Sequence, residues 1–145
     1  MFSLFEWKKH ELIFVGVVLL VILVISQIQL KVGQMKTRDA QRKADVELVG
    51  RALDKYYADH QVFPPAEDGK ILSCGGVVDL VCDWGKDLIR DLKGTVYLNK
   101  LPADPLADQG RSYVYEVDKT RQQYRIYVTL ENCQGDVQCK WYIEN

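Results

Sequence analysis

The sequence predicts an α+β protein in which one long N-terminal helix packs on a small antiparallel sheet of three strands. Residues 12–59 contain no proline, and apolar side chains recur there at helical spacing. Residues 112–143 hold three runs in which apolar and polar side chains alternate, separated by short connections. A long helical segment followed by a group of short strands is typical of the α+β class.

The first part of the predicted helix is suited to lipid. Residues 12–30 contain no ionisable side chain, and their only polar side chains are Ser26, Gln27 and Gln29. At ~1.5 Å per residue this stretch spans roughly 28 Å, close to the ~30 Å of a hydrocarbon core. A secretory signal would have a shorter apolar centre followed by a cleavage site of small residues, which we do not find. We therefore expect residues 1–30 to be a leader and a transmembrane helix.

The second part of the predicted helix is amphipathic, with one polar and one apolar face. Over residues 31–59, Val46, Val49, Leu53 and Tyr56 form a narrow apolar stripe. The two prolines that follow Phe63 end the helix. We expect residues 31–145 to form one extracytoplasmic domain: an amphipathic helix (31–59), a loop region (60–111) and the sheet (112–145).

The loop region contains two further predicted elements. Residues 67–70 have the composition of a turn. Residues 86–93 place Leu88, Ile89 and Leu92 at helical spacing, which predicts a short helix covering the sheet edge or the long helix.

The predicted sheet is a meander of residues 112–117, 123–130 and 139–143. The connections between these runs have the length of hairpin loops. A sheet of three strands has one face to bury, and the apolar stripe of residues 46–57 is the surface available to cover it.

Charge and cysteine usage limit the partners and the compartment. Nineteen basic and twenty acidic residues give a net charge of −1, which excludes a field that would gather nucleic acid. Of the three possible pairings of the four cysteines, the local ones close the shortest loops and are favoured over four reduced thiols; the cysteines are Cys74, Cys82, Cys133 and Cys139.

Two signals disagree about orientation. Lys8 and Lys9 precede the apolar segment, but five basic residues follow it closely, and a count of positive charges would place the C-terminal side in the cytoplasm. Disulfides require an oxidising space and argue for the reverse. We give the cysteines more weight and expect a single-pass protein with a cytoplasmic N-terminus and an extracytoplasmic or cell-surface domain.

No catalytic grouping is visible. His10 and His60 are the only histidines, and Ser73 lies in no nucleophile motif. Loop acids could hold calcium, but their spacing does not match an EF-hand, and solvated carboxylates are the default; these acids are Asp104, Asp108 and Asp118. We expect no enzyme, no cofactor and no small-molecule substrate.

Several motifs follow one another along the chain: Glu11 at the start of the apolar helix, RDAQRKAD at 38–45, ALDKYY at 52–57, Phe63-Pro64, LNKLPADP at 98–105 and SYVY at 112–115. In this order they resemble the motifs of the type IV pilins and the pseudopilins of type II secretion. The resemblance implies a structural subunit that assembles into a filament through its hydrophobic N-terminal helix, with membrane lipid and sister or other pilin-like subunits as its partners. It also implies that Glu11 guides assembly by charge pairing, with Lys8 or Lys9 as possible cations.

One feature leaves a second function open. The family is processed after a glycine, whereas Glu6 and Trp7 occupy the corresponding positions here. The alternative is therefore an unprocessed, membrane-anchored module that does not polymerise and binds a partner through the loops at Cys74–Cys82 and Cys133–Cys139.

Overall fold

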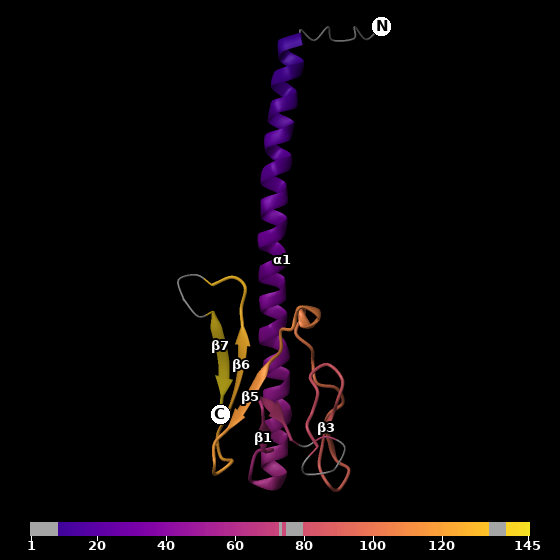
Figure 1. Cartoon of the computed structure of the whole chain (residues 1–145), viewed down its shortest axis with the longest axis vertical. Helices are drawn as coiled ribbons and strands as arrows, with labels where there is room; N and C mark the ends of the chain where they lie inside the picture. The colour runs from indigo at the N-terminus through magenta and orange to yellow at the C-terminus, as the bar shows by residue number, and fades with distance from the viewer. Residues whose placement is uncertain (1–8, 73, 75–79, 134–138) are drawn as a thin grey trace.

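One helix runs through the molecule, and all the strands gather around its C-terminal half (Figure 1). The computed structural model describes residues 9–72, 74, 80–133 and 139–145. Helix α1 (Lys9–His60) is unbroken over 52 residues, a rod of about 78 Å. Its N-terminal half extends beyond the strands (Figure 1). The α+β architecture predicted from the sequence is confirmed.

The end of α1 is a change of backbone conformation followed by the two prolines. Gln61 adopts a left-handed conformation with φ 60°, and its N–H still donates to the carbonyl of Tyr57 at 2.7 Å. Phe63, Pro64 and Pro65 then lead into the hairpin of β1 (Ala66–Glu67) and β2 (Lys70–Ile71). Asp68 and Gly69 at its tip have φ values of 48° and 75°, as a two-residue hairpin turn requires. The turn predicted at residues 67–70 is confirmed.

The predicted short helix at residues 86–93 is wrong. Residues Ile89–Arg90 form strand β3, which pairs with β4 (Val96–Leu98), and Leu92 is exposed. Aspartates on either side of β3 bind local backbone instead of continuing a helix. The Asp87 carboxylate accepts from the N–H of Asp83 at 2.7 Å, and that of Asp91 accepts from the N–H of Thr95 at 2.7 Å. Such side-chain bonds compete with a helix that is too short to be stable alone.

The three-stranded meander is present as predicted. After a 3₁₀ turn (Ala107–Gln109), β5 (Val114–Val117), β6 (Tyr124–Thr129) and β7 (Lys140–Glu144) pair antiparallel in the order β5-β6-β7. Tyr115 lies opposite Ile126, which lies opposite Ile143. The β1–β2 hairpin joins this sheet through a 2.8 Å bond from the N–H of Tyr115 to the carbonyl of Gly69. The predicted connection at 134–138 lies outside the described residues.

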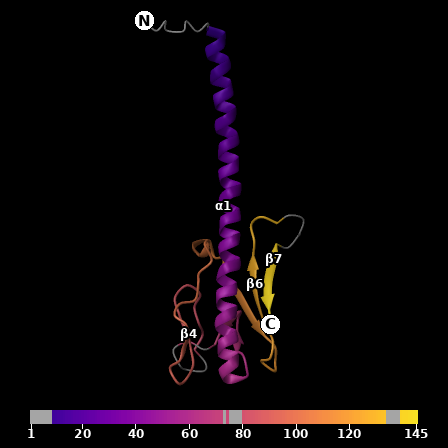
Figure 2. The same cartoon turned by 180° about the vertical axis from the view of Figure 1, so that it is seen from behind.

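The sheet and the β3–β4 hairpin lie on opposite sides of α1 (Figures 1 and 2). The apolar stripe of α1 is buried between them, which confirms the predicted packing. The fully covered apolar side chains of this core come from the helix, the loop region and the sheet: Val46, Val49, Leu53, Phe63, Ile71, Ile89, Leu101, Tyr115 and Ile126.

Gly50 lies where the sheet approaches the helix closely. A Cβ atom at this position would lie 2.7 Å from Ile143 Cδ1 and 2.9 Å from Tyr124 Oη. Two turns away, the ammonium of Lys43 lies 5.3 Å from the ring centre of Trp141. The absence of a side chain at Gly50 therefore allows β6 and β7 to seat against α1.

Candidate functional site

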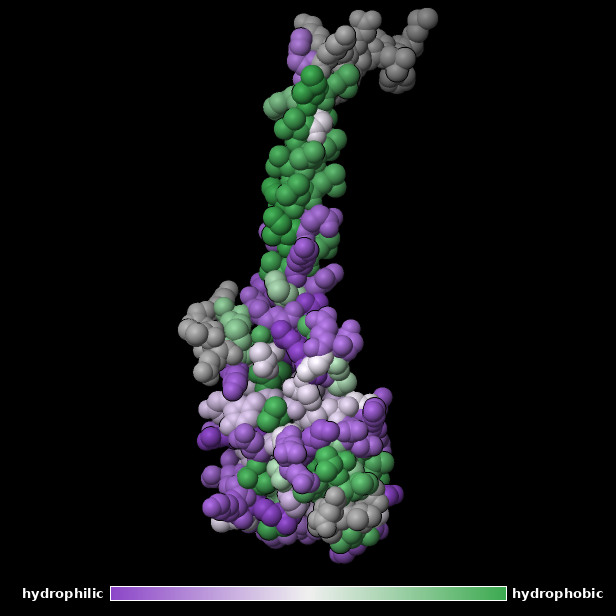
Figure 3. All heavy atoms as spheres, viewed as in Figure 1, coloured by the Kyte–Doolittle hydropathy of each residue, from purple (hydrophilic) through white to green (hydrophobic). Residues whose placement is uncertain are grey.

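The apolar half of α1 is exposed around its whole circumference (Figure 3). Every large apolar side chain from Leu12 to Leu30 is exposed, with Phe14 at 70%. The hydroxyl of Ser26 donates to the carbonyl of Ile22 at 2.8 Å, so this polar group is satisfied by its own helix. The segment is long and apolar enough to cross a membrane. An exposed apolar surface of this size indicates contact with lipid or with another protein.

A change of surface character marks where this segment ends. Lys31 is the first ionisable residue after the apolar run, and Lys36 and Arg38 follow it. In Figure 3 the hydrophobic surface gives way to a hydrophilic one between the exposed rod and the strands. The helix itself continues through this boundary without interruption. One rigid element thus joins two environments.

The predicted assembly residues lie at the far end of the rod. Glu11 is exposed in the first turn of α1. Lys9 is the first residue of the helix, and Lys8 lies outside the described residues. Glu11 is therefore separated from the domain by the whole apolar segment.

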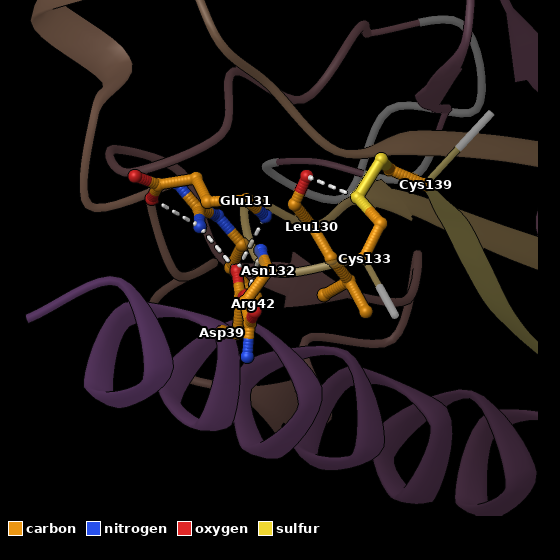
Figure 4. The surroundings of a disulfide bond; sticks show 7 residues. All are labelled: Asp39, Arg42, Leu130, Glu131, Asn132, Cys133 and Cys139. Carbon is orange, nitrogen blue, oxygen red and sulfur yellow. Dashed lines mark hydrogen bonds and ion pairs between the residues drawn. A yellow bond between two sulfur atoms is a disulfide. The ribbon is translucent and has the colours of Figure 1, made fainter. Parts of the chain in front are cut away.

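A cluster of charged residues, which we call the Arg42 clamp, fastens the domain to the helix where the domain begins (Figure 4). Arg42 is 0% exposed. Its Nε and Nη2 donate to the two carboxylate oxygens of Asp104 at 2.8 and 3.1 Å. Its Nη1 donates to Asp39 at 2.8 Å and to Glu131 at 2.6 Å. One buried guanidinium thus holds the loop before β5, the segment after β6 and its own helix together.

Neighbouring residues complete the clamp. Arg38 Nε and Nη2 donate to the two oxygens of Glu131 at 2.8 and 2.5 Å. The Asp39 carboxylate accepts from the backbone N–H groups of Glu131 and Asn132 at 2.9 and 2.8 Å. Charge-assisted and two-pronged bonds of this kind fix geometry as well as adding energy. The chain that leaves β6 is therefore held to α1 by both its backbone and its side chain.

Sequence reasoning missed the clamp, although a signal for it was present. Asp39 and Arg42 continue the stripe of Val46 and Val49 backwards at the same three- and four-residue spacing. A charged pair on the buried face of a helix needs partners from the element that covers it. The identity of those partners, 62 and 89 residues further along, is not encoded by local spacing.

The clamp predicts a loss of stability in acid. The bonds that Arg38 donates, assisted by Arg42, lower the pKa of Glu131 from 4.5 to about 2. A carboxyl whose pKa is lower in the folded state stabilises the fold above its unfolded pKa and loses this effect as the pH falls through the folded pKa. Urea titrations of the full chain should therefore show its unfolding free energy falling between about pH 4.5 and about pH 2.

Glu131→Gln should flatten this dependence in part. Part of it should remain because the contacts of Asp118, first among them the bond from Thr120, lower its pKa to about 2 as well. Glu116→Gln, which changes an exposed carboxylate of β5, is the matched control and should leave the slope as it is. An unchanged slope in Glu131→Gln would contradict the assignment.

The cysteines are paired locally, as favoured from the sequence. Cys74 bonds to Cys82 and Cys133 to Cys139, with Cα–Cα distances of 5.4 and 5.3 Å. The first bridge is buried in the core, and the second lies beside the Arg42 clamp (Figure 4). The two loops that they close, proposed above as alternative binding loops, lie for the most part outside the described residues.

Two of the three loop acids considered for calcium, Asp104 and Asp118, serve separate structural roles. Both oxygens of Asp104 are bonded to Arg42. The Asp118 carboxylate accepts from the N–H groups of Thr120, Gln122 and Gln123. Within the part of the chain that the structure describes, no three His, Cys, Asp or Glu residues are grouped to hold a metal ion.

The remaining candidates considered from the sequence are two histidines and a serine. The ring of His60 is tilted against that of Tyr56, with 4.3 Å between ring centres, and its Nε2 lies 3.4 Å from Asp91. His10 is exposed at the start of α1, and Ser73 lies outside the described residues.

Comparisons with known proteins add no assignment. No family model, no curated protein and no solved structure matches the chain. The function of the chain is therefore inferred from the geometry of the molecule.

Proposed function

We propose that the chain is a pilin-like structural subunit of a type IV pilus or a type II secretion-like filament, without catalytic activity. The observation that carries this proposal is the division of α1 into two halves. The half before residue 31 is apolar and exposed, whereas the half after it is the spine of a folded domain. A subunit of this kind can move between a membrane and a filament core, because both cover the same apolar surface.

The shape of the exposed half supports packing on several sides. A single helix with apolar side chains around its circumference can contact more than one neighbouring helix at once. In lipid there is little hydrophobic gain from such contacts, so close packing and polar pairing select the neighbours. Subunits stored as single-pass membrane proteins could therefore assemble when their helices are brought together.

The contacts of the domain fix its orientation relative to the apolar half of α1. The Arg42 clamp begins near the surface boundary, and the apolar core continues from it to the end of α1. We place the domain outside the cytoplasm because both disulfides need an oxidising space. A rigidly held domain gives every subunit of a filament the same lateral contacts.

Glu11 has an assembly role in this proposal. A carboxylate next to an apolar run is costly in lipid unless a cation pairs with it, and a neighbouring subunit can supply one, with Lys8 or Lys9 as candidates. Glu11→Ala should therefore insert into membranes normally but lose assembly. The test joins copies that carry Leu19→Cys, an exposed position in the apolar half, with a thiol-specific crosslinker in native membranes.

The expected result is a ladder of oligomers from the Leu19→Cys chain and monomers when Glu11→Ala is added. Glu47→Ala changes an exposed glutamate on the domain half of the same helix and should leave the ladder intact. A ladder that survives Glu11→Ala would contradict the role of Glu11. Monomers alone from the Leu19→Cys chain would favour the anchored module that does not polymerise.

A further inference from the structure

A pocket of about 310 Å³ lies on the domain, remote from the apolar half of α1. It is bounded by β2, by the turn after Cys82, by the connector that carries Asp104 and by the loop between the 3₁₀ turn and β5. Its polar lining residues are Lys70, Asp83, Trp84, Lys86, Asp104, Arg111 and Ser112. None of these groups belongs to the apolar surface proposed for assembly.

The two acids of the pocket are already engaged. Asp83 Oδ1 lies 2.8 Å from the ammonium of Lys70, and its Oδ2 lies 3.9 Å from that of Lys86. Both oxygens of Asp104 are bonded to Arg42, and one of them also accepts from the N–H of Leu106 at 2.8 Å. Among the described residues, neither carboxylate accepts a hydrogen bond from the third cation of the pocket.

That third cation is Arg111, which is half-buried. Its Nη1 is buried and has no acceptor among the residues that the structure describes. The indole Nε1 of Trp84 is also buried and also has no acceptor among these residues. The Trp84 ring packs edge-on against Tyr113, with 5.3 Å between ring centres. A buried donor without an acceptor costs about 1–3 kcal/mol, and more when it is charged. Both residues line the same pocket, and an oxygen acceptor that reached their nitrogens would satisfy both donors.

The charge of the pocket selects the acceptor. Three cations against two carboxylates leave a single positive charge, which matches one carboxylate better than a phosphate of charge near −2. A guanidinium also binds the two oxygens of a carboxylate in parallel.

We propose that this pocket binds a carboxylate group, held by Arg111 and the indole N–H of Trp84. Because both nitrogens are covered, binding includes small shifts of the Arg111 and Trp84 side chains. The carboxylate can come from a free organic acid or from an acidic side chain of a peptide.

The indole N–H signal of Trp84 tests this directly. The full chain, labelled with ¹⁵N and held in detergent micelles, is titrated with sodium acetate, with sodium chloride at equal ionic strength, and with a capped peptide containing one glutamate. Trp84→Phe assigns the signal among the three tryptophans. We expect a saturable shift with acetate and none with chloride. Tighter binding of the peptide would identify a protein segment as the source, and equal binding would identify a small acid.

Variants separate binding from folding. Arg111→Gln should weaken acetate binding at least tenfold, and Arg111→Lys should weaken it less. Lys119→Gln removes one positive charge from an exposed loop and should bind as the unchanged chain does. The absence of a saturable shift with both acetate and peptide would overturn the proposal. So would equal binding by Arg111→Gln, or inorganic phosphate binding more tightly than acetate.

Discussion

Arg42→Ala is expected to lower the free energy of unfolding of the domain by about 3–5 kcal/mol, because it leaves buried charges without their partner. Asp104 would lose both of its bonds to the guanidinium, and Asp39 and Glu131 would lose one each. Arg38 would still bind Glu131, so the largest share of the loss would come from Asp104, which would be left buried without a cation. Urea unfolding of the full chain in detergent micelles, followed by tryptophan fluorescence, measures the change.

Arg51→Ala is the matched control for this experiment. Arg51 is an exposed arginine on the same helix, nine residues further along, so its removal should change stability by less than about 0.5 kcal/mol. Equal effects of the two substitutions would show that the Arg42 clamp does not hold the domain.

Phe63→Ala is expected to cost about 3–5 kcal/mol, the usual range for a buried phenylalanine that is truncated. Phe63 is fully buried where the chain turns from α1 to the strands. Its ring lies 4.6 Å from that of Tyr57 on the helix and 4.7 Å from that of Tyr124 on β6. Removing the ring opens a cavity in the core between α1 and β6. The same urea titration measures the loss.

Phe14→Ala tests whether the two halves of α1 are independent. Phe14 is 70% exposed in the apolar half, so its truncation should leave the stability of the domain within about 0.5 kcal/mol. A large loss from Phe14→Ala would mean that the apolar half packs on the domain, contrary to the division of the helix described above.

The sequence allowed the long elements to be predicted because periodicity is a local property. The 3.6-residue spacing of Val46, Val49 and Leu53 and the alternation of Tyr124, Ile126 and Val128 each identify an element and its buried face. The packing of the sheet on α1 could then be predicted, because the apolar stripe of the helix is the surface available to cover a three-stranded sheet.

The same local signal failed where side chains bond to the backbone. Leu88, Ile89 and Leu92 have helical spacing, but Asp91 binds the N–H of Thr95 and closes a turn instead. The Arg42 clamp escaped prediction for a different reason. Its partners come from loops whose positions depend on the finished fold, so the helix shows that a buried arginine needs acids without showing which ones.

The most direct test of the account is a distance along α1. Nitroxide labels at Leu19 and Leu48, two exposed positions on either side of the boundary, are separated by 29 residues, or about 44 Å of continuous helix. Pulsed electron spin resonance on the full chain in lipid nanodiscs, diluted with unlabelled protein, measures this separation. One narrow distribution near that value is the predicted result. A shorter or broad distribution would show that the rod breaks between lipid and domain, and would contradict the claim that one helix serves both.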